Sequence, residues 1–154
     1  MTVDELKRYG LEGMREEEID QFLDCESTGV LGLPADGLPY LVPLSYAYDG
    51  DSSLYFTYVL GTNSTKEELT KAAARGRFLV HQVDSMFSWR SVLLDGTFEA
   101  VRPSDWGEMA DVLEDVWRPE VFRISSTSRN VKIYEFKITD RTGIKHTGLS
   151  EEIA

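Results

Sequence analysis

Three short apolar segments follow one another in the first half of the chain, and only turn residues separate them. They cover Val30–Leu33, Leu38–Tyr48 and Leu54–Val59, with Pro34-Ala35-Asp36-Gly37 and Asp49-Gly50-Asp51-Ser52 between them. Branched and aromatic residues favour strands, and clusters of Pro, Gly and Asp are typical of tight turns. The pattern therefore predicts an antiparallel meander. It argues against a doubly wound fold, which would need a helix between consecutive strands.

Further helices and strands are predicted on either side of this meander. Helices are expected over Arg15–Asp24, Thr65–Arg75 and Asp105–Val116, and strands over Phe78–Val83, Ser88–Val101 and Val131–Thr139. Thr142–Ala154 has the composition of a polar tail. Six strands in 154 residues favour a single domain, residues 1–154, built as a small antiparallel β-barrel with flanking helices.

Local signals mark several element boundaries. Thr65, followed by Glu68 three positions later, forms a capping box, and Gly76 has the place of a C-terminal cap. Gly96 interrupts the longest strand, which indicates a bulge or a barrel corner. Pro43 lacks an amide proton, so the strand that contains it is expected at an edge of the sheet.

The charge balance restricts the possible partners. The chain has 27 Asp and Glu against 16 Lys and Arg, which gives a net charge of −11. Such a surface repels nucleic acid and anionic lipids, and neither is expected as a partner. No apolar run has the length of a membrane span, and Met1–Gly13 lacks the apolar stretch of a secretion signal. We expect a cytoplasmic protein, either halophilic or an ordinary acidic one.

The junction Gly61-Thr62-Asn63-Ser64-Thr65-Lys66 is the strongest candidate for ligand binding. A helix N-terminus offers unpaired amides and a positive dipole to a phosphate, and the hydroxyls of Ser64 and Thr65 add donors. Lys66 opposes the helix dipole in the first turn, and this local conflict favours a functional role. The alternative is a solvated lysine after an ordinary helix cap.

Two strand segments offer surfaces for a flat ligand. The edge strand around Pro43 can pair its backbone with a heterocycle such as the pyrimidine ring of a flavin, whereas Tyr46 and Tyr48 would serve core or dimer packing. Strand alternation places Trp89 and Ser91 on one face. They would border a planar cofactor or, alternatively, be a core tryptophan beside a tolerated serine.

The sequence lacks other recognised catalytic arrangements. His81 and His146 are the two histidines, and neither has a second ligand at a metal-binding spacing, so no metal is expected. We interpret His81 as half-buried. Cys25, the one cysteine, is expected to be a core residue, and it excludes an internal disulfide. No side chain has the setting of a general acid or base, so catalytic residues are unassigned.

In their order, these segments resemble the FMN-binding split β-barrel superfamily, especially its pyridoxamine 5′-phosphate oxidase-related and nitroimidazole-resistance-like members. The resemblance extends from Met14 to Val101. It is carried by Phe22-Leu23, Gly29-Val30-Leu31-Gly32, the run from Leu38 to Tyr46, Leu54-Tyr55-Phe56-Thr57, Ser64-Thr65-Lys66, and Trp89-Arg90-Ser91-Val92 with Gly96. It implies a six-stranded antiparallel split β-barrel, and a homodimer with two FMN molecules at its interface.

The resemblance also implies a role for each matching position. The backbone of one strand would face the flavin ring, a second strand would lie near the ribityl chain, a helix start would hold the phosphate, and a third strand would flank the flavin. The residues implied are, in that order, Pro43, Leu44 and Ser45; Thr57; Ser64, Thr65 and Lys66; and Trp89 and Ser91.

Some positions depart from the family pattern. The oxidase carries an arginine where Thr65 stands, and its tail bears Arg and Pro where Lys137–Ala154 shows no such pattern. Resistance-type relatives often carry histidine where Thr57 stands. We therefore expect not the oxidase activity itself but a flavin-dependent oxidoreductase with an unidentified small substrate and NAD(P)H as a donor. The alternatives are a reductase that binds deazaflavin F420 on the same fold, and a non-enzymatic flavin carrier or redox sensor.

Overall fold

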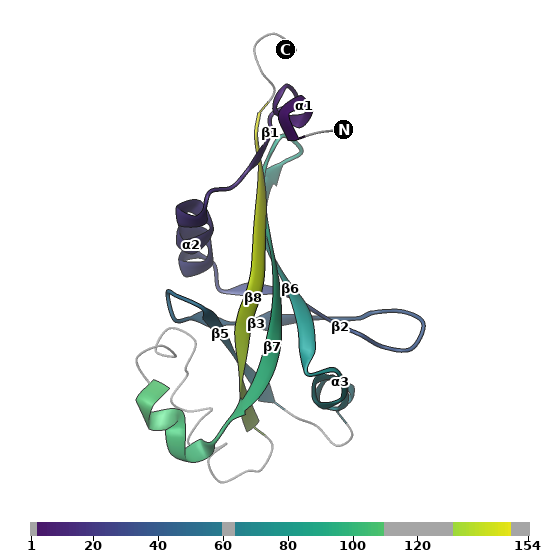
Figure 1. The fold of residues 1–154 in the computed structure, drawn as a ribbon, viewed down its shortest axis with the longest axis vertical. Helices are drawn as coiled ribbons and strands as arrows, with labels where there is room; N and C mark the ends of the chain where they lie inside the picture. The colour runs from purple at the N-terminus through teal and green to yellow at the C-terminus, as the bar shows by residue number, and fades with distance from the viewer. Residues whose placement is uncertain (1–2, 60–63, 110–130, 149–154) are drawn as a thin grey trace.

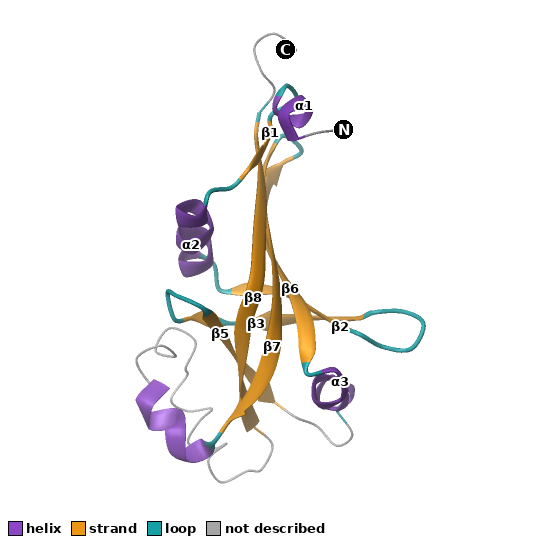
Figure 2. Cartoon of the chain, viewed as in Figure 1, coloured by secondary structure: helices purple, strands orange, loops and turns teal. Residues whose placement is uncertain are grey.

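A twisted antiparallel sheet dominates the fold, and the computed structural model describes it over residues 3–59, 64–109 and 131–148 (Figures 1 and 2). Within these ranges the strands are β1 Leu11–Gly13, β2 Thr28–Leu33, β3 Tyr40–Ser45, β4 Ala47–Tyr48, β5 Ser53–Val59, β6 Arg75–Ser85, β7 Ser88–Val101 and β8 Val131–Thr147. The helices there are α1 Val3–Lys7, α2 Glu16–Cys25, α3 Thr65–Ala73 and the 3₁₀ helix η1 Pro103–Met109. None of these described helices is long and apolar enough to cross a membrane.

The order of strands explains how the sheet curls around one core. It runs β3-β2-β6-β7-β8-β5-β4, and β1 pairs with β8 beyond the end of β5. Alternate residues of five strands point inward, and α2 adds one face of its helix. Enclosed core residues include Ile19, Phe22, Leu23, Leu31, Leu33, Leu54, Phe56, Tyr58, Phe78, Val80, Val92, Leu94 and Phe136. The predicted antiparallel split β-barrel is thereby confirmed.

The described part of the sheet has eight strands, so the predicted number of six is wrong. One extra strand arises because the predicted strand Leu38–Tyr48 divides at Tyr46. The Tyr46 amide donates to the Ser27 carbonyl at 2.9 Å and its buried hydroxyl donates to the Leu23 carbonyl at 2.8 Å. Tyr46 therefore leaves the β3 ladder and becomes a core residue. The other extra strand is the three-residue β1.

The last strand is longer than its sequence predicts. β8 continues past Thr139 to Thr147, because β1 and the first half of β7 take up its backbone hydrogen-bonding groups. Polar side chains on this extension pair with α2: Arg141 Nε lies 2.7 Å from Glu16, and Lys145 Nζ lies 2.7 Å from Glu18. The prediction of a polar tail from Thr142 onward is therefore wrong for residues 142–147, which belong to β8. The remaining residues of the tail, 149–154, lie outside the described residues.

The bulge predicted at Gly96 is present. The β7–β8 register shifts between Asp95 and Gly96, which leaves Thr139 of β8 without a partner across the ladder. A Cβ on Gly96 would lie 2.6 Å from a ring carbon of Phe136, closer than van der Waals contact allows. The sheet therefore turns its corner at a position that only glycine fits.

Both predicted caps of α3 are displaced. Ser64 takes the place of Thr65 as the N-cap, and its Oγ accepts a hydrogen bond from the Glu67 amide at 3.3 Å. At the other end, α3 stops before Gly76 is reached. Gly76 lies in β6 opposite Gly96, because pairing with β7 begins as soon as the helix ends.

Three smaller expectations are corrected or left open. Cys25 is exposed, since the buried stripe of α2 lies on another side of the helix. His81 is also exposed, on β6. The described part of the predicted helix Asp105–Val116 is the 3₁₀ helix η1, because its hydrogen bonds begin in a tight turn where the Asp105 amide donates to Arg102. Residues 110–116 lie outside the described residues.

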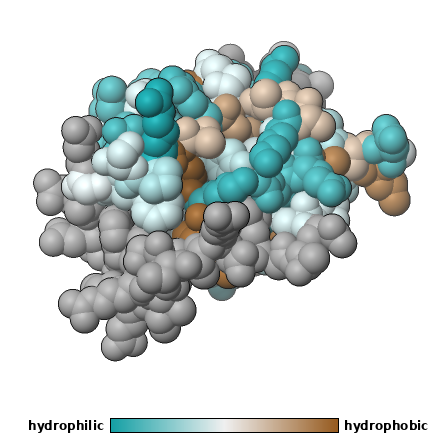
Figure 3. Space-filling model, turned by 90° about the horizontal axis from the view of Figure 1, so that it is seen from below, coloured by the Kyte–Doolittle hydropathy of each residue, from teal (hydrophilic) through white to brown (hydrophobic). Residues whose placement is uncertain are grey.

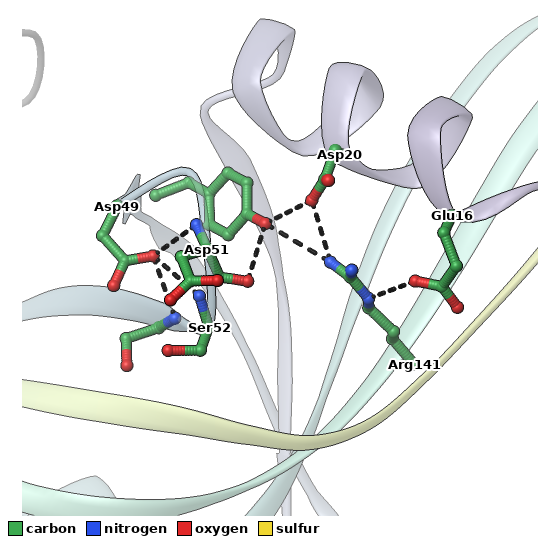
Figure 4. Close-up of polar contacts among 8 residues, drawn as sticks. Glu16, Asp20, Asp49, Asp51, Ser52 and Arg141 are labelled. Atoms are coloured by element: carbon green, nitrogen blue, oxygen red, sulfur yellow. Dashed lines mark hydrogen bonds and ion pairs between the residues drawn. The ribbon is translucent and has the colours of Figure 1, made fainter.

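A polar network fastens α2 to the sheet (Figure 4). The hydroxyl of Tyr48 donates to Asp20 at 2.5 Å, and Arg141 reaches the same carboxylate at 2.9 Å while its Nε holds Glu16. Burial and the neighbouring Asp20 raise the pKa of Tyr48 to about 12, so its hydroxyl remains a donor. Asp49 closes the adjacent turn by accepting three backbone amides. These contacts join α2 to β4 and β8, so we assign the network a structural role.

Candidate functional site

The first turn of α3 holds a lysine with unusual surroundings. The Lys66 ammonium lies over the ring of Tyr58, 4.5 Å from the ring centroid, and the side chain is half-buried. No carboxylate among the described residues forms an ion pair with it, although the chain carries 27 Asp and Glu. Burial lowers the pKa of Lys66. The site thus keeps a partly desolvated cation to which the described residues bring no compensating anion.

The backbone of this turn adds hydrogen-bond donors. The Ser64 side chain satisfies the amide of Glu67, whereas helix geometry gives the amides of Thr65 and Lys66 no partner inside the helix. Free amides and a positive helix end suit an anion. The three residues predicted to hold a phosphate, Ser64, Thr65 and Lys66, are therefore together at one helix start.

Two residues that the sequence analysis misses hold Lys66 in place. Thr70 Oγ1 donates to the Lys66 carbonyl at 2.7 Å and lies 3.0 Å from the Tyr58 hydroxyl. Because a hydroxyl has one proton, Tyr58 is the donor to Thr70. The Tyr58 ring also packs against that of Tyr134, with centroids 4.7 Å apart. The spacing of Lys66 and Thr70, one helical turn, is the signal in the sequence that points to this support.

Thr57 lies on the same strand as Tyr58 but points to the other face of the sheet. It pairs with Ile133 across the β5–β8 ladder and is half-buried, whereas Tyr58 points into the core. Alternation along β5 causes this separation. Thr57 therefore lies on the opposite face of β5 from Tyr58, whose ring contacts the Lys66 ammonium.

The strand that contains Pro43 lies at the edge of the described sheet, as predicted, because β3 ends the strand order. Pro43 and Ser45 are exposed on the outer face of the sheet, opposite the core. Leu44 points inward and packs against the core, which leaves only its backbone for a ligand. The three residues thus offer an edge of main-chain groups beside two exposed side chains.

Trp89 and Ser91 lie on β7, and they share the outer face with Pro43. The register shows this, because residues paired across a ladder point to the same face. Pro43 pairs with Val30, Val30 with Leu79, and Leu79 with Leu93 of β7. Alternation along β7 then places Ser91 and Trp89 on the same face as Leu93. At the usual strand spacing, β7 is about 14 Å from β3. One chain therefore does not bring Trp89 and Ser91 into contact with the Pro43 segment.

The outer face is apolar and hollowed. Leu41 is 65% exposed and Ile144 is 49% exposed, and an ion pair between Arg77 and Asp95 at 2.6 Å crosses the face. A cavity of about 790 Å³ opens here, with a lining that includes Val30, Gly32, Leu41, Arg77, Leu79 and Leu93. Figure 3 views the molecule from below, at the end near α3, and shows a strip of hydrophobic surface between hydrophilic groups. Among the described residues, no group of three or more His, Cys, Asp or Glu side chains is placed to hold a metal ion.

Comparisons with known proteins assign the family. The model of the pyridoxamine 5′-phosphate oxidase family matches residues 15–145, whereas no curated protein matches the chain. The fold is similar to that of a FAD-binding protein from Mesorhizobium loti, with a TM-score of 0.71 and 22% identity over 89% of this chain and 99% of that one.

Two further solved structures have the same fold. The FAD and heme binding protein from Mycobacterium smegmatis has a TM-score of 0.71 and 19% identity, covering 92% of this chain and 76% of its own. A candidate 5-nitroimidazole antibiotic resistance protein from Bacteroides thetaiotaomicron has a TM-score of 0.67 and 19% identity, covering 88% and 89%. With a family match over most of its length and this shared fold, the chain belongs to the pyridoxamine 5′-phosphate oxidase family.

Proposed function

We propose that this family member binds FMN and is a flavin-dependent oxidoreductase acting on a small substrate. The observation that carries the proposal is Lys66, a half-buried cation with no ion-pair partner among the described residues. The terminal phosphate of FMN is an anion of matching charge, and FMN supplies hydride and electron transfer when bound. The residues of the chain bind and orient it.

The remaining contacts follow from the placement of the candidate residues. Ser64 and Thr65 join Lys66 around the phosphate, while the backbone of Pro43, Leu44 and Ser45 faces the ring. An edge strand that contains a proline leaves main-chain groups for a heterocycle rather than for another strand. The resemblance to the family assigns Thr57 to the ribityl chain, and Thr57 would make this contact from the outer face of β5.

The proposal includes a homodimer that packs through the apolar outer face. Leu41 is 65% exposed and Ile144 is 49% exposed on this face, which also carries the apolar cavity, and burial of this surface would stabilise a dimer. A second copy also supplies what one chain lacks, because Trp89 and Ser91 lie about 14 Å from the β3 edge of their own chain. Both residues then flank the flavin that is bound mainly by the other subunit.

A titration tests the cofactor. Purified protein is added to FMN, to riboflavin and to deazaflavin F420, and binding is followed by the change in fluorescence. We expect micromolar or tighter binding of FMN and weaker binding of riboflavin. Absence of any change with FMN at micromolar protein rejects the proposal, and a preference for F420 assigns the other cofactor.

A second measurement tests the activity. Steady-state oxidation of NAD(P)H by the FMN-loaded protein, in the presence of an artificial electron acceptor, is expected for an oxidoreductase. Stoichiometric binding of FMN without turnover identifies a flavin carrier or redox sensor instead.

A further inference from the structure

A second lysine lies at the same end of the barrel as Lys66. Lys132 stands directly opposite Tyr58 in the β5–β8 ladder, and the ring of Tyr58 carries the Lys66 ammonium. The Lys132 ammonium forms an ion pair with Glu67, the residue that follows Lys66. Strand β8 and helix α3 therefore both place Lys132 beside the first turn of α3.

Among the described residues, the charged side chains around the start of α3 do not balance. Glu67 also pairs with Lys71 at 2.9 Å, so the contacts around the helix start contain three lysines and one glutamate. With Glu68, which is also in the first turn of α3, their sum is one positive charge, in a chain whose net charge is −11. Tyr134, which also lies close to Glu67 and Lys71, is held neutral because burial raises its pKa. A phosphate monoester, which is an anion at pH 7, is attracted to this excess of positive charge.

The two lysines that pair with Glu67 differ in their setting. The Lys71 side chain is 62% exposed, and its backbone lies one helical turn beyond Glu67 on the same helix. The Lys132 side chain is 39% exposed and crosses from β8 to α3. An ammonium held between two elements and partly withdrawn from water contributes more to an anion site than an exposed one on a helix surface.

We propose that Lys132 is a second phosphate-binding residue of the flavin site, acting with Lys66. The inference rests on the proposed function, since it assigns a further contact to the same phosphate. It concerns a residue that the sequence pattern of the helix start does not include. The ligand group that Lys132 would contact is a phosphate, so inorganic phosphate is expected to compete with FMN for this site.

The test compares Lys132→Gln with Lys71→Gln. Each variant removes one positive charge and one partner of Glu67, so the pair controls for net charge. We expect Lys132→Gln to weaken FMN about 10- to 100-fold, to leave riboflavin unchanged and to reduce competition by inorganic phosphate, while Lys71→Gln changes FMN less than about threefold. Lys132→Arg, which keeps the charge, should retain most of the affinity.

The outcomes separate this inference from the proposed function. If wild-type protein binds FMN and the two Gln variants weaken it equally, the role of Lys132 is rejected and the flavin site stands. If Lys132→Gln weakens riboflavin as much as FMN, or lowers the urea midpoint of the apoprotein, Lys132 supports the fold and the inference is overturned. If wild-type protein binds no FMN, the proposed function itself fails.

Discussion

The ammonium of Lys66 lies 4.5 Å from the centre of the Tyr58 ring, and the hydroxyl of that ring is tied through Thr70 to the Lys66 carbonyl. One tyrosine thus holds both the side chain and the backbone of the lysine. The ring face attracts the cation but carries no net charge, whereas a carboxylate would neutralise the ammonium. The charge therefore stays available to an anionic ligand.

Replacement of Lys66 by methionine should separate FMN from riboflavin. The variant keeps the apolar stem but loses a charge-assisted contact of about 1.5–3 kcal/mol, so FMN affinity should fall roughly 10- to 150-fold. Riboflavin, which lacks the phosphate, should bind as before. The apoprotein should be as stable as wild type or slightly more so, because a cation is removed from the positive end of α3. Fluorescence titrations of both ligands check this.

The pH dependence of the wild-type protein gives an independent check on Lys66. Burial lowers its pKa below the ordinary 10.5, so its charge is lost earlier as pH rises. The ratio of FMN affinity to riboflavin affinity should therefore decline before pH 10.5 is reached. Lys66→Met should show a flat ratio over the same range, and a declining ratio in that variant would assign the titration to another group.

Replacement of Leu41 by glutamate should separate the dimer into monomers. The side chain is 65% exposed at the edge of the outer face, where a charge in a packed interface would be desolvated without a partner. Light scattering should then give the chain mass of 17.4 kDa, against twice that for wild type. Val59→Glu is the control, since Val59 is 64% exposed on β5, which four strands separate from β3 in the sheet order. A wild-type mass of one chain contradicts the proposed dimer.

Replacement of Gly96 by alanine should destabilise the fold. The new methyl group would meet Phe136 at 2.6 Å and the Lys137 carbonyl at 2.7 Å, and overpacking of this kind costs about 1–3 kcal/mol. Gly13→Ala, at a strand position with nothing within 4 Å, should leave the free energy of unfolding unchanged or raise it by a few tenths of a kcal/mol. Urea unfolding of both variants measures the contrast, and equal midpoints would show that the bulge yields at little cost.

The stability contributed by Glu18 should disappear in acid. Hydrogen bonds from Lys145 and then Arg15 lower its pKa to about 2, below the unfolded value of about 4.3. A depressed carboxyl pKa stabilises the folded state above pH 4.3, and this contribution is lost as pH falls toward 2. Glu18→Gln should therefore lower the free energy of unfolding by about 0.5–1 kcal/mol at pH 7 and by much less near pH 2.5. Glu17→Gln, at an exposed position of the same helix, serves as the control.

Local signals in the sequence predict most of the fold. Apolar segments separated by turn residues predict the strands at Val30–Leu33 and Leu54–Val59, and Gly96 marks the bulge because no side chain fits there. The end of β8 escapes prediction, because polar residues such as Arg141 form a strand only when β1 and β7 supply backbone partners. A pairing partner distant in sequence leaves no local signal.

The candidate site is likewise predicted where its signals are local and missed where they depend on distant contacts. The helix start at Ser64 is visible because capping chemistry is local, and the edge position of β3 follows from Pro43. Tyr58, by contrast, reads as one more alternating core residue. Its role depends on α3 packing across the end of the barrel, which no window of sequence contains.

The central place of β8 also determines when this protein can fold. Of the strands described, β8 emerges last from the ribosome, yet it pairs with β1, β5 and β7, so residues as distant as Glu12 and Lys145 must meet. Pairings of such high contact order form slowly. Until residue 131 is synthesised, at about 5–20 residues per second, β5 and β7 each present an unpaired edge beside apolar core residues. The nascent chain therefore exposes two unpaired strand edges for a few seconds, between the synthesis of β7 and that of β8, and it is most prone to aggregation in this interval.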